Sequence, residues 1–223
     1  MTEPIHNYSE IGKLKTVMLK RPGQELENFT PEMLKRLLFD DIPYLQNAQK
    51  EHDMFAQKLE KNGVEVLYLE NLSAEALDAG GNEAKNYFLE EMLKESGYSI
   101  GTTHDALKEY LYQMSTAKMV NKIMSGVRKN ELDFNPRDLA SLSEDPDYEF
   151  YLDPMPSLYF TRDTSACIGN GVSINHMAYP ARQRESLFNE IIMKYHPGFL
   201  IKGFLFGVIA TTIRALKVGM NWY

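Results

Sequence analysis

The residues best suited to chemistry lie in one segment, MPSLYFTRDTSACIGN, which spans positions 155–170. Two aromatic residues, Tyr159 and Phe160, precede Asp163 by a few positions, and a turn with a glycine follows. A carboxylate beside an aromatic wall can bind a cation, because its two oxygens match two nitrogens of a guanidinium. Taken alone, however, the pattern favours a surface or turn aspartate that pairs with a neighbouring arginine.

Other groups with chemical potential have structural interpretations. The single cysteine, Cys167, lies in an apolar, strand-like run that suggests a buried thiol, and no base or cation adjoins it in the sequence. We therefore reject it as a nucleophile. His176 and His196 lack metal-ligand spacing to any cysteine, aspartate or glutamate, which predicts no metal site. We expect structural roles for the two remaining clusters, Asp40-Asp41 and Glu51-His52-Asp53.

The elements that must position these residues begin with a strand, a helix and a strand. Residues 14–20 alternate in polarity, residues 48–61 carry apolar positions at helical spacing, and residues 64–69 alternate again. Thr30-Pro31-Glu32 is a typical helix start, and Asn62-Gly63 is a typical helix end. A strand–helix–strand order predicts an α/β fold with a parallel or mixed sheet.

A helical stretch interrupts this frame from about residue 73 to 137. The expected helices are 74–79, 83–95, 103–115 and 116–127. Beyond an acidic, proline-bearing loop we expect strands at 158–160 and 166–174 and an amphipathic helix at 185–195. The order of elements thus predicts an α/β fold that contains a helical insertion.

Composition restricts the function classes. The 223 residues carry a formal net charge of −7, which argues against nucleic acid or an anionic membrane as partner. One cysteine fits a reducing compartment, no apolar signal segment is visible at the start, and we expect a cytoplasmic protein. The apolar run 200–212 is shorter than the roughly 20 residues of a membrane span and contains Lys202.

Three long motifs carry a family resemblance: RPGQELENFTPEMLKRLLFDDIPYLQNAQKEHDMF near the start, MPSLYFTRD, and IGNGVSINHM followed by ARQRES. The chain from Leu14 to Phe199 resembles the arginine deiminases. The resemblance implies hydrolysis of free L-arginine to L-citrulline and ammonia without a cofactor, through a cysteine thiolate and a histidine.

The resemblance also assigns substrate-binding residues. It implies that Asp163 binds the substrate guanidinium, that Phe160 packs against the substrate and that Arg182 binds its carboxylate. Leu38 would line the pocket. At Ser157 the sequence departs from the asparagine usual in the family, which puts a contact with the amino-acid end of the substrate in doubt.

The family fold resembles an α/β propeller of five modules, of which this chain would supply about two. The implied organisation is a first module at 1–72, a helical insertion at 73–150, a second module with the substrate-binding loop at 151–199, and a tail at 200–223. A homo-oligomer is compatible with this organisation.

The tail reads as the family sequence in a shifted frame. Methionine and tryptophan have one codon each, so shifting Met220 to Tyr223 by one base forces Glu, Leu and Val. The upstream codons permit IEGGDELV, which resembles a catalytic-core motif of the arginine deiminases. We therefore expect a one-base frameshift after Phe199, with the nucleophilic cysteine and catalytic histidine missing and the polypeptide inactive alone.

Three alternatives stay open. A related guanidine-modifying enzyme, such as an agmatine deiminase or an amidinotransferase, is the first, and Arg182 discriminates because agmatine has no carboxylate for it to bind. A non-catalytic guanidinium-binding or oligomerisation fragment is the second. A protein tethered to a membrane through residues 200–212 is the third.

A frameshifted tail was never selected to pack, so deleting residues 200–223 should change the free energy of unfolding by less than about 1 kcal/mol. Denaturant unfolding of the full and shortened chains measures the difference. A loss of several kcal/mol on deletion would mean that the tail is native structure and would contradict the frameshift.

Overall fold

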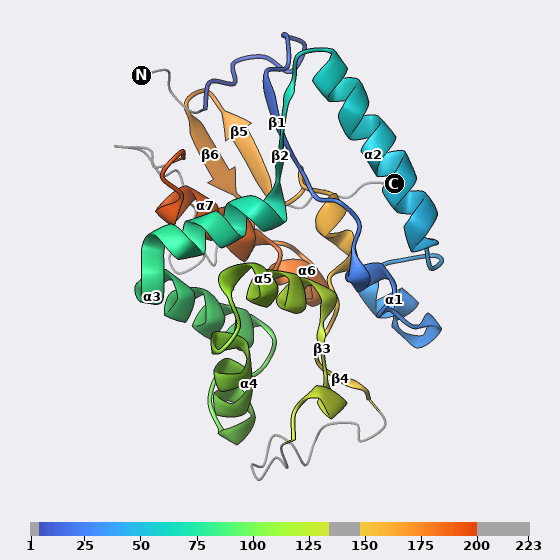
Figure 1. The fold of residues 1–223 in the computed structure, drawn as a ribbon, viewed down its shortest axis with the longest axis vertical. Coiled ribbons are helices and arrows are strands. Elements are labelled where there is room, and N and C mark those ends of the chain that lie inside the picture. Colours follow the sequence, from blue (N-terminus) through green and yellow to red (C-terminus); the bar gives the residue numbers. More distant parts are fainter. Residues whose placement is uncertain (1–4, 134–147, 200–223) are drawn as a thin grey trace.

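The computed structural model describes residues 5–133 and 148–199 (Figure 1). The expectations for residues 200–223 lie outside these ranges. Helices and strands are mixed, as expected of an α/β protein. No helix within the two described ranges is both long and apolar enough to cross a membrane.

The predicted strand–helix–strand unit is confirmed. Strand β1 (Thr16–Leu19) pairs in parallel with β2 (Glu65–Tyr68), and α2 (Leu45–Lys61) connects them. The connection from β1 to α2 contains two 3-10 turns, the second at Pro31–Met33, and the short helix α1 (Leu34–Leu37). Helix α2 ends directly before Asn62-Gly63, where Gly63 has a φ of 77° that suits glycine.

Three helices fill the expected helical stretch: α3 (Leu69–Glu95), α4 (Thr102–Tyr112) and α5 (Thr116–Ser125). The first two predicted helices are joined in α3, where Gly81 turns the backbone through a φ of 61°. Helix α7 (Ser186–Tyr195) packs against α3, and Phe88 meets Phe188 edge to face with ring centroids 5.4 Å apart. This contact lies in the main hydrophobic core.

Two small antiparallel strand pairs are also present among the described residues. Strand β3 (Val127–Arg128) pairs with β4 (Phe150–Leu152), which brings both sides of the 134–147 segment together. Strands β5 (Ser165–Ile168) and β6 (Gly171–Ile174) form a hairpin, where one strand was predicted over 166–174. Gly169, with a φ of 59°, supplies the two-residue turn that the single-strand prediction missed.

The strand predicted at 158–160 was wrong, because Pro156–Tyr159 is a 3-10 helix. Pro156 lacks an N–H and has a fixed φ, both of which suit the first position of a helical turn. The turn is closed by Leu158 N–H to the Met155 carbonyl, and Phe160 N–H donates to the Ser157 carbonyl. Asp163 therefore follows a helical turn and not a strand.

Charged groups gather where the two parallel strands end. Lys20, directly after β1, is buried and bonded to Glu25 at 3.0 Å. Glu70, shortly after β2, has an oxygen that is buried without a hydrogen-bond partner among the described residues. Burial raises the pKa of Glu70, although nearby Lys20 opposes the shift.

This raised pKa predicts a pH-dependent effect of one substitution. A carboxyl with a higher pKa in the folded state stabilises the fold below its usual value of 4.5 and loses that contribution as pH rises through the raised value. Glu70→Gln should therefore raise the free energy of unfolding at pH 7 by about 1 kcal/mol, and by less at pH 4.5. Urea unfolding at both values is the measurement, with exposed Glu83→Gln on the same helix as control. A stabilisation that is equal at both values would contradict the prediction.

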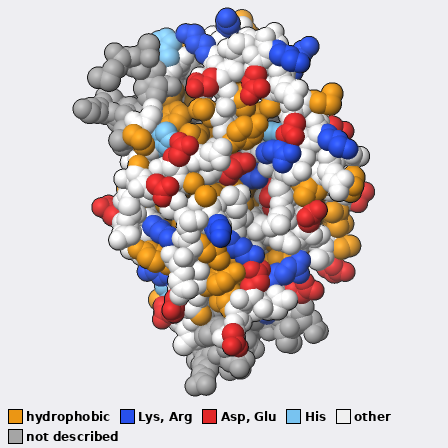
Figure 2. Space-filling model, in the orientation of Figure 1, with side chains coloured by type: hydrophobic (Ala, Val, Ile, Leu, Met, Phe, Trp, Pro, Cys, Tyr) orange, Lys and Arg blue, Asp and Glu red, His pale blue; other side chains and the backbone are white. Residues whose placement is uncertain are grey.

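The surface carries mixed charge. Figure 2 shows acidic and basic side chains interspersed with apolar ones over one face. This distribution gives the face no single-sign field of the kind that attracts a polyanion.

Candidate functional site

The candidate site is built on the loop after the 3-10 helix and on the short helix α6 (Pro180–Gln183). The Thr161 hydroxyl donates to the Met18 carbonyl at 3.0 Å and ties the loop to β1. Asn175, just after β6, donates its side-chain amide to the Asp163 carbonyl at 2.9 Å. The backbone of Asp163 is thereby fixed by two separate elements.

Asp163 and Arg182, 19 positions apart in sequence, form an ion pair. Arg182 Nη1 donates to Asp163 Oδ2 at 2.8 Å. The Asp163 side chain is 46% exposed, whereas that of Arg182 is only 13% exposed. Asp163 therefore pairs with an arginine, but not with a neighbouring one as the local pattern had favoured. Its sequence neighbour Arg162 instead pairs with Glu10.

Glu185 holds the other side of the Arg182 guanidinium. Arg182 Nε lies 3.1 and 3.0 Å from the two Glu185 oxygens, and Nη2 lies 2.9 Å from Oε2. The Glu185 side chain is 1% exposed. Burial opposes the charge of Arg182, but the bonds to Glu185 and Asp163 outweigh it and raise the pKa of the guanidinium.

Sequence reasoning missed the role of Glu185, which it used only as a helix start. Its spacing of three residues from Arg182 is a signal that could have suggested contact on a helical turn. Pro180 at the first position of α6 fixes that turn.

An aromatic wall adjoins the ion pair. Phe160 is 46% exposed, and the Arg182 guanidinium carbon lies 6.0 Å from its ring centroid. Tyr159 packs against Phe160 with ring centroids 4.1 Å apart and meets Phe39 edge to face at 6.3 Å. The structure thus brings Asp163, Arg182 and Phe160 together.

Leu38 and Ser157 lie near the aromatic wall but take no part in the Asp163–Arg182 ion pair. Leu38 is 44% exposed and adopts a left-handed φ of 64°, the one positive φ among the described non-glycine residues. It is the following residue, Phe39, that contacts the aromatic wall through Tyr159. Ser157 is buried, and its carbonyl accepts the Phe160 N–H. A left-handed leucine costs about 1 kcal/mol, and such strain is common near functional sites.

The other candidates have structural surroundings or lie apart. Asp53 pairs with Arg21 through two bonds of 2.7 and 2.9 Å, and His196 contacts Glu75 at 2.9 Å. Cys167 is exposed on β5, not buried as the apolar run suggested, and partial burial of its thiol raises its pKa. A raised pKa disfavours the thiolate form that a nucleophile needs. Within the described ranges no group of histidine, cysteine, aspartate and glutamate side chains could hold a metal ion.

The fold and site define an α/β protein in which a carboxylate beside an aromatic ring holds a guanidinium. The arginine deiminase family profile matches residues 35–212, and the chain belongs to that family. The match extends past Phe199, the expected position of the frame change.

Curated relatives give the same family. The chain is similar to the arginine deiminase of Lentilactobacillus hilgardii, with 74% identity over 203 residues that make up 91% of this chain and 49% of the relative. Arginine deiminases of Levilactobacillus brevis and Latilactobacillus sakei are 70% and 60% identical over the same length, again 91% of this chain and 50% and 49% of theirs. The chain spans about half the length of the curated relatives it matches.

Glu185 is buried and Asp163 is half exposed, so we expect their replacement to have unequal effects on stability. Glu185→Ala should lower the free energy of unfolding by about 3 kcal/mol, because a nearly buried guanidinium loses its main acceptor. Asp163→Ala removes a half-exposed partner and should cost less than about 1 kcal/mol. Urea unfolding of both variants at neutral pH measures the difference. Equal losses would mean that Asp163 is as structural as Glu185.

Proposed function

We propose that the described residues form the substrate-binding half of an enzyme that hydrolyses L-arginine to L-citrulline and ammonia. The observation that carries the proposal is the half-exposed Asp163 carboxylate, which binds a guanidinium beside the Phe160 ring. The Arg182 guanidinium that binds Asp163 is the same chemical group as the side chain of a free arginine. A carboxylate that accepts one guanidinium at 2.8 Å can accept another in the same geometry.

The roles of the residues follow from their surroundings. Asp163 binds the substrate guanidinium, and Phe160 packs against its flat face. Glu185 holds Arg182 through Nε and Nη2, so Nη1 can leave Asp163 without freeing the side chain. Arg182 then donates hydrogen bonds to the substrate carboxylate. Leu38 lines the pocket near the aromatic wall, and the buried Ser157 supports the loop.

Chemistry beyond binding needs a nucleophile and a base. Cys167 is the single cysteine of the chain, and its raised pKa makes it a poor nucleophile. We propose that residues 1–223 alone form no citrulline. In the proposed enzyme, a second half of the kind found in the relatives supplies the nucleophilic cysteine and the catalytic histidine. No cofactor is required by this scheme.

The organisation proposed for the whole protein is a propeller of five α/β modules. Residues 1–72 and 151–199 would be two of them, residues 73–150 the helical insertion, and residues 200–223 a frameshifted tail. The parallel β1–α2–β2 unit and the β5–β6–α7 segment are compatible with two modules. A cytoplasmic location and a homo-oligomer belong to the same proposal.

A second candidate is a non-catalytic guanidinium-binding fragment. Asp163 already pairs with a guanidinium within this half-length chain, so binding does not require the missing chemistry. Titration calorimetry of residues 1–223 with L-arginine and with agmatine tests this candidate. Saturable binding of arginine supports the candidate, and its absence would contradict it. Equal binding of agmatine would show that Arg182 takes no part.

The experiment for the enzyme joins residues 1–199 to the second half of the Lentilactobacillus hilgardii relative. This chimaera should form citrulline from arginine, and Asp163→Ala should lower kcat/KM by roughly 1,000-fold or more, because the cation loses its paired acceptor in the transition state. Colorimetric citrulline assay gives the rates.

Two controls accompany the assay. Asp105→Ala, at an exposed site on α4, should leave kcat/KM within about twofold. The printed chain should give no citrulline. Activity of the printed chain that disappears in Cys167→Ala would overturn the rejection of Cys167, and near-normal activity of the Asp163→Ala chimaera would remove Asp163 from the site.

A further inference from the structure

A second site lies in a cavity of about 1130 Å³ between α1, the end of α3, the β3–β4 pair and α6. Neither Asp163 nor Arg182 lines it, so it is separate from the candidate substrate site. Its volume is comparable with that of small-molecule pockets, which hold roughly 300–1,000 Å³.

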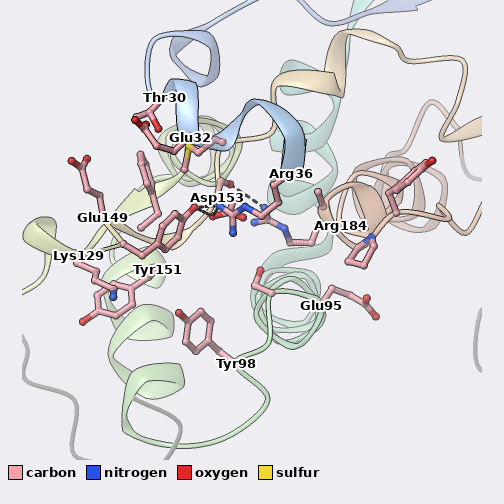
Figure 3. Close-up of a pocket in the computed structure, with 17 residues that line it drawn as sticks. Thr30, Glu32, Arg36, Glu95, Tyr98, Lys129, Glu149, Tyr151, Asp153 and Arg184 are labelled. Atoms are coloured by element: carbon pink, nitrogen blue, oxygen red, sulfur yellow. Dashed lines mark hydrogen bonds and ion pairs between the residues drawn. The ribbon is translucent and has the colours of Figure 1, made fainter. Parts of the chain in front are cut away.

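Two arginines from different elements converge on one aspartate in the cavity wall. Arg36, from α1, donates to Asp153 Oδ1 at 3.0 Å, and Arg184, directly after α6, donates to the Asp153 carbonyl at 3.0 Å. Figure 3 shows both guanidinium groups directed at Asp153. The Asp153 carboxylate, which also accepts from Tyr148, balances one of the two positive charges. Arg36, Arg184 and Asp153 together carry one net positive charge.

Arg184 also has unused donor capacity. The residue is 3% exposed, and its Nη1 is buried without a hydrogen-bond partner among the described residues. A buried donor without an acceptor costs about 1–3 kcal/mol. Arg36, whose side chain is 47% exposed, can meet an incoming anion first. A small rotation of the Arg184 side chain would then present Nη1 to the same anion.

Aromatic rings make up much of the remaining wall. Tyr98 meets Tyr151 edge to face at 6.3 Å, and the Arg36 guanidinium lies 4.6 Å from the Tyr148 ring centroid. The aromatic lining residues are Tyr98, Tyr148, Phe150, Tyr151 and Tyr179. Such rings favour an aromatic ligand through edge-to-face or stacked contacts.

Acidic lining residues restrict the charge of the ligand. Glu32, Glu95 and Glu149 also face the cavity. The charges of these glutamates outnumber that of the remaining basic lining residue, Lys129, and would repel a multiply charged anion such as a polyphosphate. A ligand with one carboxylate can still pair with Arg36 and Arg184.

We propose that this cavity binds a small molecule that carries one carboxylate next to an aromatic ring system. The carboxylate lies between Arg36 and Arg184, and the rings contact Tyr98, Tyr148 and Tyr151. The site is a binding site only, with no reaction assigned to it.

Isothermal titration calorimetry of the full chain tests this with indole-3-acetate and its neutral amide, indole-3-acetamide. The acid should bind at least about tenfold more tightly than the amide, since only the acid matches the arginines. Arg36→Gln should weaken acid binding by about tenfold and change amide binding by less than about twofold. Arg184→Gln should do the same.

Arg21→Gln is the matched control, because Arg21 is similarly exposed at 39%, pairs with Asp53 and does not line the cavity. It should leave acid binding unchanged, as should Asp163→Asn. Since replacement of the buried Arg184 can unfold the chain, Arg36→Gln at its half-exposed position keeps the test decisive.

Equal affinity for acid and amide, equal losses in Arg21→Gln and Arg36→Gln, or no saturable binding of the acid would each overturn the proposal. Loss of acid binding in Asp163→Asn would place the ligand at the candidate substrate site and would also overturn it.

Discussion

The guanidinium of Arg182 lies almost out of water, and the candidate site depends on how its charge is compensated. An unpaired buried cation would be far less stable than a hydrated one, so carboxylates must lie beside it. Glu185 meets this requirement with three close contacts and is itself buried. Because Glu185 already compensates the charge of Arg182, the stability of the buried guanidinium does not depend on Asp163. Under the proposed function, this is the property that lets the half-exposed Asp163 exchange Arg182 for a substrate guanidinium.

Changing partners also needs a backbone that does not move. The loop of Asp163 has an anchor on each side: Thr161 bonds to β1, and Asn175 reaches back from β6. Beneath it Leu158 lies in the main core with the packed pair α3 and α7. The loop of Asp163 is thus supported by core packing among the described residues. The proposed binding geometry can therefore exist without the groups proposed to carry out the reaction.

Prediction from the sequence succeeded where the physical cause is local. The β1–α2–β2 unit follows from alternation, helical spacing and the Asn62-Gly63 stop, all of which act within a few residues. It failed at Pro156–Tyr159, where strand-forming residues are held in a 3-10 turn by Pro156 and by core contacts of Leu158. The pairing of Asp163 with Arg182 spans 19 positions and that of Arg36 with Asp153 spans 117, so neither has a local signal. The predicted site residues were identified through the motif resemblance, whereas the role of Glu185 became apparent only from the structure.

Helix α6 and the residue directly after it contribute one arginine to each of the two proposed sites. A turn of helix directs successive side chains around its axis, so Arg182 and Arg184 need not face the same way. Arg182 meets Glu185 and Asp163, whereas Arg184 meets Asp153 at the cavity wall. Each arginine is nearly buried, and each has an acceptor supplied by a distant part of the chain. The two arginines differ in their hydrogen bonds. The side-chain hydrogen bonds of Arg182 go to the carboxylates of Glu185 and Asp163. Arg184 instead shares Asp153 with Arg36, and its Nη1 has no hydrogen-bond acceptor among the described residues. Carboxylates of the chain itself therefore compensate the charge of Arg182. Under the proposal for the second site, an anionic ligand adds to the compensation of Arg36 and Arg184.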